Sequence, residues 1–268
     1  MSYMGFTKLM SRYLDLINQP MILEIGVDRG QTALPLLHNL SCTCKEGFRW
    51  IGVDVQFDDT FCNQVLQMIG LAGGMIVNLE KLNFRGSSWN TAFLKMNSLD
   101  AMSKMVDIGL RFDLIMIDGD HNYATVFEEL KLAKQLSHES TIIIADDFRG
   151  KWAREDCFYK DRPTHADNEL LHRPTHVLED EDSKTSKNKK GVRTAIEDWI
   201  ISEKDYTLLD IQKDAVVIFR KNIHVEFFDQ TDTISDAGLI LHSNSKDNYR
   251  FKKHVAHSLN KGESIKHY

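Results

Sequence analysis

The chain has few cysteines, no long apolar run and no excess of positive charge. Its four cysteines lack the paired C-x-x-C spacing of a zinc site and we expect no secretory leader, so reduced thiols are expected at Cys42, Cys44, Cys62 and Cys157. No apolar stretch approaches the length of a membrane span. The formal net charge of −6 provides no overall attraction to phosphate polymers. These absences predict a cytoplasmic protein that binds neither membranes nor nucleic acids.

The chain does contain enough apolar sequence for a full core. Hydrophobic residues make up 42% of its 268 residues and charged residues 27%, as in ordinary globular proteins. Residues 149–190 break the regular pattern with charges, histidines and two prolines. We therefore expect one domain over residues 1–222, with a charged lid insertion at 149–190 and a C-terminal extension at 223–268.

Apolar periodicity divides the domain into alternating strands and helices. Short apolar runs predict strands at 22–25, 50–54, 75–79, 113–117 and 141–145, and a hairpin at 206–211 and 215–220. Helical spacing predicts helices at 4–18, 31–40, 64–70, 99–106, 126–136 and 191–202. This order predicts an α/β fold of the doubly wound, Rossmann-like type, in which a mostly parallel seven-stranded sheet ends in an antiparallel C-terminal hairpin.

Glycines and a carboxylate follow the first expected strand closely. Glu24, Gly26 and Gly30 have the acid-x-Gly-x-x-x-Gly spacing of a nucleotide loop, but Asp28 stands where a dinucleotide fingerprint has its middle glycine. A pyrophosphate needs close backbone approach at that point, and a carboxylate there opposes it sterically and electrostatically. This disfavours an NAD-dependent oxidoreductase. A cofactor with a positive sulfonium and an amino-acid tail would tolerate both acids.

With these residues the sequence resembles the class I S-adenosylmethionine-dependent methyltransferases. The resemblance implies that Glu24, Gly26 and Gly30 form the loop around the methionine part of the cofactor. It also implies that Asp54, at the end of the second strand, binds the ribose hydroxyls, since a carboxylate accepts from both of them. The alternative is that the two glycines only make a tight turn. Ser98 lies where the family often places a polar residue next to the adenine.

An alternative for the segment that contains Ser98 is purely structural. Asn97 and Ser98 directly precede the helix expected from Leu99 onward, and both residue types are favoured as helix caps. The sequence leaves the two interpretations open.

The segment 117–123, Ile-Asp-Gly-Asp-His-Asn-Tyr, resembles a subset of this class, the metal-dependent O-methyltransferases of small molecules, including those that modify sugars. The resemblance implies that Asp118, Asp146 and Asp147 hold one Mg²⁺ ion and that His121 is the general base, while Asp118 also lies against the cofactor. Hard oxygen ligands with open positions suit magnesium. A histidine has the pKa range to accept the proton of a hydroxyl.

Electrostatics gives an independent reason to expect a cation. Three acids at two neighbouring strand ends repel one another by ~1 kcal/mol or more per pair at partial burial, and a bound metal ion relieves this repulsion. A metal would also lower the pKa of the acceptor hydroxyl and align its oxygen with the methyl group. The alternatives are that Asp118 contacts only the cofactor and that Asp146 and Asp147 only cap a strand end.

These observations predict an enzyme that transfers a methyl group from S-adenosylmethionine to a hydroxyl of a small molecule or sugar, with Mg²⁺ as second cofactor. One alternative is a metal-free methyltransferase that acts on nitrogen. Another is a catalytically silent cofactor-binding protein whose charged lid binds a protein partner. The identity of the acceptor and the oligomeric state, including a homo-oligomer, stay open at this point.

Overall fold

The structure is a computed structural model of the chain. It describes residues 10, 13–15, 17–44, 46–57, 63, 91–156, 191–210 and 214–221. The strands are β1 (Met21–Ile25), β2 (Arg49–Asp54), β3 (Thr91–Lys95), β4 (Phe112–Ile117), β5 (Ser137–Ala145), β6 (Tyr206–Asp210) and β7 (Val216–Arg220). The helices are α2 (Ala33–Thr43), α4 (Ser98–Asp107), α5 (Tyr123–Gln135), the 3-10 helix η2 (Lys151–Ala153) and α7 (Gly191–Ser202).

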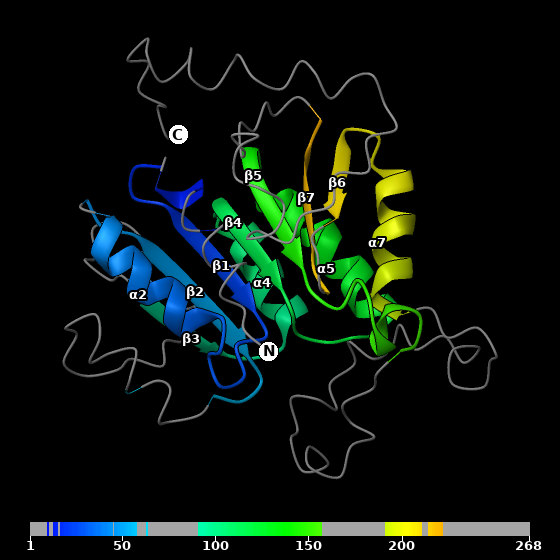
Figure 1. The fold of residues 1–268 in the computed structure, drawn as a ribbon, viewed down its shortest axis with the longest axis horizontal. Helices are drawn as coiled ribbons and strands as arrows, with labels where there is room; N and C mark the ends of the chain where they lie inside the picture. Colours follow the sequence, from blue (N-terminus) through cyan, green and yellow to red (C-terminus); the bar gives the residue numbers. More distant parts are fainter. Residues whose placement is uncertain are drawn as a thin grey trace, which may run out of the picture.

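The seven strands form one sheet in the order β3-β2-β1-β4-β5-β7-β6 (Figure 1). The pairs from β3 through β5 are all parallel. Strand β7 is antiparallel to both β5 and β6, so it alone opposes the other six. The strand order reverses between β1 and β4, where doubly wound sheets bind their ligands. The predicted fold class is confirmed.

The third strand among the described residues, β3, was not predicted from the sequence. The place beside β2 is taken by β3, with Asp54 opposite Lys95. Residues 75–79, which were predicted for this place, and the helix predicted at 64–70 lie outside the described residues, as do Cys62 and Cys157. Of the predicted lid insertion, 149–156 is described and 157–190 is not.

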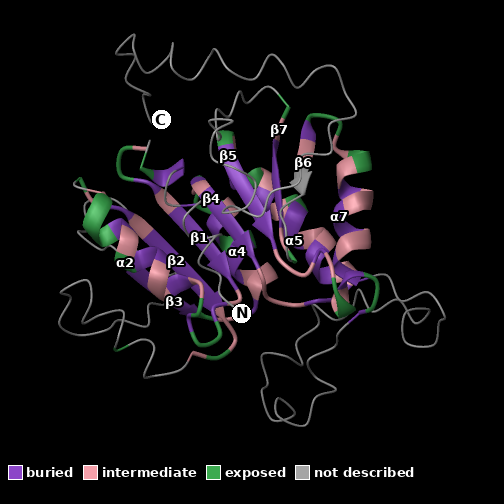
Figure 2. Cartoon of the chain, in the orientation of Figure 1, coloured by how far each residue is buried: buried purple, intermediate pink, exposed green. Residues whose placement is uncertain are grey.

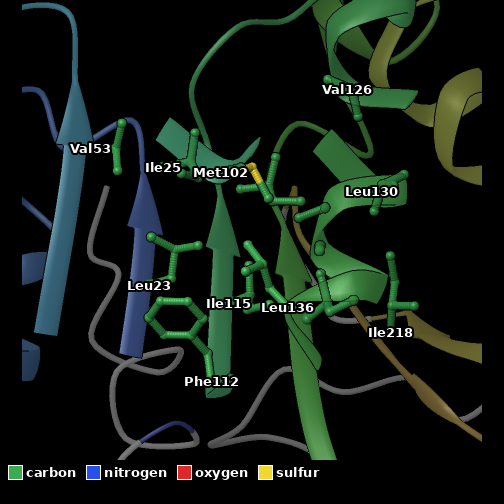
Figure 3. Close-up of a cluster of buried hydrophobic side chains, with 14 of the residues drawn as sticks. Leu23, Ile25, Val53, Met102, Phe112, Ile115, Val126, Leu130, Leu136 and Ile218 are labelled. Atoms are coloured by element: carbon green, nitrogen blue, oxygen red, sulfur yellow. The ribbon is translucent and has the colours of Figure 1, made fainter. Parts of the chain in front are cut away.

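Each face of the sheet is covered by its own apolar layer. Alternate strand residues point to opposite faces, so Leu23 and Ile25 pack toward α4, α5 and α7, while Ile22 packs toward α2. Figure 3 shows part of the first layer, in which Met102 of α4 and Leu130 of α5 lie over the strands. The central strands are buried along nearly their whole length (Figure 2). Burial on both faces fixes the register of the sheet, and with it the level at which each strand ends.

The helices begin and end close to their predicted limits. Pro35 lies in the first turn of α2, where its missing N–H costs no helical hydrogen bond. Asn97 is the N-cap of α4 and its side chain accepts a hydrogen bond from the Leu99 amide at 2.9 Å. Among the described residues, no helix has both the length and the apolar character needed to cross a membrane.

Candidate active site

The sheet register brings the predicted residues to one edge. Ile25 pairs with both Val53 and Ile117, and Ile117 pairs with Ala145, so strands β1, β2, β4 and β5 end at about the same level. The residues that follow these ends are the glycine turn at 26–30, the Asp118 turn, and Asp146 with Asp147. Their convergence follows from the parallel sheet, although they are up to about 120 positions apart in sequence.

The glycine turn packs directly on the Asp118 turn. Gly26 has a φ of +81°, and a Cβ placed on it would lie 1.9 Å from the Asp118 carbonyl oxygen. Gly30 also has a positive φ, +71°. Asp28, at the position without the fingerprint glycine, has a φ of +45°. The chain thus takes there a left-handed conformation that aspartate tolerates better than most residues.

Asp54 supports this glycine turn from the neighbouring strand. Its Oδ2 accepts hydrogen bonds from the amides of Val27 and Asp28, both at 2.8 Å, and its Oδ1 accepts from the Gln56 amide at 3.0 Å. Burial raises the pKa of the Asp54 carboxyl, and these three backbone hydrogen bonds oppose the rise. Asp54 therefore orders the loop, a role that the sequence prediction did not include. Its predicted contact with a ribose stays a prediction.

Glu24 lies beneath the turn and is almost fully buried, with an exposed fraction of 2%. Its Oε2 accepts a hydrogen bond from Trp50 Nε1 at 2.9 Å. Burial raises the pKa of its carboxyl to about 8, against the hydrogen bond from Trp50. The indole of Trp50 thus fixes the side chain that was predicted to open the cofactor loop.

Asp118, His121 and Asp147 form the tightest cluster at this edge. One ligand atom from each lies within 4.8 Å of the others, as a metal site requires. His121 Nε2 is 2.6 Å from Asp147 Oδ2 and 3.5 Å from Asp118 Oδ1. Burial lowers the pKa of His121, but hydrogen bonds to Asp118 and Asp147 outweigh burial and raise it to about 10. The imidazole is thus the positive partner of both carboxylates.

Asp146 lies beside this cluster but is not one of its three members. Burial and the charge of Asp118 raise the pKa of the Asp146 carboxyl to about 7. Asp147 follows in the left-handed conformation, with a φ of +53°. The structure therefore brings Asp118, His121 and Asp147 together, and Asp146 remains a predicted ligand.

Two further acids near the cluster, Asp120 and Glu129, were given no role in the sequence analysis. The Oδ2 of Asp120 accepts hydrogen bonds from Thr125 Oγ1 at 2.8 Å and from the Asn122 side chain. Glu129 is fully buried, and within the described part of the chain no hydrogen bond of normal geometry reaches its carboxyl oxygens. Burial raises the pKa of this carboxyl to about 8, although the Ser98 hydroxyl offsets part of the rise.

Trp152, in the first part of the predicted insertion, lies over the catalytic candidate. Its ring is near parallel to that of His121, with an interplanar angle of 29° and a centroid distance of 6.4 Å. The Lys151 ammonium lies over the same indole, 4.4 Å from its centroid. Trp152 therefore borders the cluster at His121.

The comparison with protein families gives residues 23–148 as a match to the family described as "Methyltransferase domain". The matched segment runs from β1 past Asp147 and includes the glycine turn and the three-residue cluster. The chain carries a methyltransferase domain. The match confirms the predicted S-adenosylmethionine-dependent methyltransferase class. No curated protein matches the chain in sequence.

Solved methyltransferase structures resemble this chain in fold. An O-methyltransferase from Bacillus cereus in complex with SAH shares 16% identity and a TM-score of 0.46, with 81% of this chain and 80% of that chain covered. The O-methyltransferase TomG from Streptomyces achromogenes, in complex with SAM, shares 13% sequence identity with a TM-score of 0.46. The alignment covers 80% of this chain and 79% of that chain. The methyltransferase MycE, in complex with Mg, SAH and mycinamycin VI, shares 10% sequence identity with a TM-score of 0.44. The alignment covers 80% of this chain and 49% of that chain. Likenesses at these identities concern the fold alone.

Proposed function

We propose that this methyltransferase domain methylates a hydroxyl oxygen of a small molecule, with S-adenosylmethionine as the methyl donor and Mg²⁺ as second cofactor. The observation that carries the proposal is the cluster of Asp118, His121 and Asp147 directly beside the glycine turn. Acid and base groups that meet at the switch point of a doubly wound sheet form a typical active site.

The glycine turn fits the methionine and ribose ends of the donor. Glycines at Gly26 and Gly30 let the backbone bend tightly without side chains in the way, and Asp54 already holds the turn in shape. The donor, when bound, supplies a methyl group on a sulfonium, which leaves as a neutral thioether. Acidic side chains such as Asp28 and Asp118 favour this positive group near them.

The donor atoms of the cluster also fit a hard divalent cation. Asp118 and Asp147 supply carboxylate oxygens, the ligands that magnesium prefers, and Asp146 is the third predicted ligand. When bound there, the ion would lower the pKa of the acceptor hydroxyl.

Asp118 and Asp147 hold the imidazole of His121 positive in the structure, and a cation bound by these carboxylates would leave the imidazole neutral. His121 would then be able to receive the acceptor proton at Nε2. This atom lies 2.6 Å from Asp147 Oδ2, so an imidazole that gains a proton forms an ion pair with Asp147. Trp152, stacked beside the imidazole, helps to keep bulk water from it. Excluding water strengthens these electrostatic interactions.

A second candidate is methyl transfer without a metal. It is favoured by the two short contacts of His121, because a positive imidazole between Asp118 and Asp147 already relieves the carboxylate repulsion that a cation was expected to relieve. Such a site could serve an acceptor nitrogen or oxygen that needs no Lewis acid.

Transfer of a radiolabelled methyl group to a panel of catechols, sugars and amines separates the two candidates. The proposal expects transfer to hydroxyl compounds that stops with a chelator and returns with Mg²⁺. It also expects Asp147→Asn to abolish transfer while binding of S-adenosylhomocysteine persists. Transfer at an unchanged rate in the presence of chelator would contradict the metal role and favour the second candidate.

A further inference from the structure

One carboxylate oxygen outside the three-residue cluster joins two helices that border it. Asp156 is buried, and its Oδ1 accepts hydrogen bonds from the Tyr123 amide at 2.7 Å and from the Gly191 amide at 3.0 Å. These are the first residues of α5 and α7, whose amides have no partner within their own helices. A buried carboxylate between two helix starts is stabilised by charge-assisted hydrogen bonds and by both helix dipoles.

The bond to Tyr123 fixes the backbone that carries His121. Tyr123 follows His121 by two residues, and the Asn122 between them caps α5 by accepting from the Thr125 amide at 2.9 Å. Two side chains therefore fix the turn that leads from the end of β4 into α5. Asn122 does so as the N-cap of this helix, and Asp156 does so from outside the helix by accepting from the next residue, Tyr123. Displacement of this turn would move the imidazole away from Asp147.

The bond to Gly191 fixes the turn that carries Trp152. Gly191 has a φ of +66°, and a Cβ placed on it would lie 2.4 Å from the Trp152 carbonyl oxygen and 2.7 Å from the Arg154 amide nitrogen. The 151–155 turn thus packs against the first residue of α7 at a distance that only glycine allows. Trp152 stacks on His121, so the segments that carry these two rings meet at Asp156.

We propose that Asp156 is a positioning residue that holds His121 at the cluster by tying the start of α5 to the start of α7. Its significance for methyl transfer rests on the proposed function, in which His121 receives the proton. The placement of the ring itself does not depend on that function and can be measured without any ligand.

The test compares Asp156→Ala and Asp156→Asn with the wild type by NMR, on protein with labelled histidine and tryptophan rings and labelled amides. In Asp156→Ala we expect the Tyr123 and Gly191 amides to exchange at least about tenfold faster, since each loses a hydrogen bond to a charged group. We also expect loss of the nuclear Overhauser contact between the rings of His121 and Trp152. Asp156→Asn keeps an accepting oxygen and should restore that contact, with exchange about threefold faster than in the wild type.

Arg154→Ala is the matched control. Its exposed guanidinium pairs with Glu197 of α7 at 3.2 Å, so the variant removes a contact between the same turn and the same helix but leaves Asp156 in place. We expect it to keep the ring contact and the slow exchange of both amides. If Asp156→Ala also keeps both, Asp156 is not a positioning residue. Where Asp156→Ala does not fold, unchanged amide exchange in Asp156→Asn overturns the proposal.

Calorimetric titration with S-adenosylhomocysteine distinguishes this proposal from the proposed function. The hydrogen bonds that Asp156 accepts within the described part of the chain come from Tyr123 and Gly191 and not from the glycine turn, so the Asp156 variants should bind S-adenosylhomocysteine within about twofold of the wild type. A loss of binding greater than tenfold in Asp156→Asn would contradict a role confined to His121. A wild type that binds no S-adenosylhomocysteine would contradict the proposed function, while the ring contact and the amide exchange still decide the role of Asp156.

Discussion

At the residue scale, Gly26 is the most constrained position of the candidate site. It combines a left-handed φ with a backbone oxygen 1.9 Å from the place of a missing Cβ. Gly47 provides the matched comparison, because it has a similar φ of +90° with no atom within 4 Å of its Cβ position. The two glycines therefore separate the cost of the backbone conformation from the cost of the steric clash.

We expect Gly47→Ala to lower the free energy of unfolding by ~1–2 kcal/mol, the cost of a left-handed alanine. Gly26→Ala should cost several kcal/mol more, because the Asp118 backbone must move away. It should also abolish binding of S-adenosylhomocysteine. Urea unfolding and calorimetry measure the two effects. Equal losses of stability in both variants would show that the turn at Gly26 yields to the added methyl group.

At the element scale, α4 depends on the cap provided by Asn97. Asn97→Ala removes the side-chain oxygen that accepts from the Leu99 amide, and we expect a loss of ~1 kcal/mol in the free energy of unfolding. Asn97→Asp keeps an accepting oxygen at the positive end of the helix and should be at least as stable as the wild type. Thermal unfolding compares the two variants. An Asn97→Ala variant as stable as the wild type would show that the cap contributes nothing.

Elements with strong apolar patterns could be predicted from the sequence, and β3 could not. Residues 91–95 begin with threonine and end with lysine, whereas residues 75–79, which lie outside the described residues, form a more apolar run, so periodicity alone favours 75–79 over 91–95. What makes 91–95 a strand is its pairing with β2, a tertiary context that the local sequence does not carry. Strand-end residues such as Asp118 and Asp54 could be predicted because a parallel sheet gathers its ends at one edge.

The side-chain contacts of the site could not be predicted in the same way. The sequence indicates that His121 and the acids converge, but not that His121 would contact Asp147 more closely than Asp118. The sequence does not single out Glu129, because it follows Glu128 in a pair of charged residues that is typical of an exposed surface. The available signal was its spacing from Val126 and Ala133, which places it on the buried face of α5.

At the scale of the whole molecule, buried acids near the sheet edge make stability depend on pH. The pKa of Glu129 is about 8 in the fold and 4.5 ordinarily, so its contribution is fully present below pH 4.5 and is lost as pH rises to about 8. Glu129→Gln removes this loss. As pH rises from 4.5 to 8, we expect the free energy of unfolding of the variant to increase by more than ~2 kcal/mol relative to that of the wild type.

Urea unfolding across this pH range measures the difference between the two proteins. The control is Glu128→Gln, which makes the same change of charge on a half-exposed side chain of the same helix. It should leave the pH dependence of the wild type unchanged. A wild type and a Glu129→Gln variant with parallel pH profiles would show that Glu129 ionises as readily in the fold as in the unfolded chain.

The whole account depends on a nucleoside cofactor at the carboxyl edge of the sheet, between the glycine turn and the cluster. The most direct test is calorimetric titration of the wild type with S-adenosylhomocysteine, S-adenosylmethionine and NAD, each with Mg²⁺ and with a chelator. The account predicts micromolar binding of both adenosyl compounds and none of NAD. Absence of binding of either adenosyl compound would contradict the roles proposed for Gly26, Asp54 and His121 together.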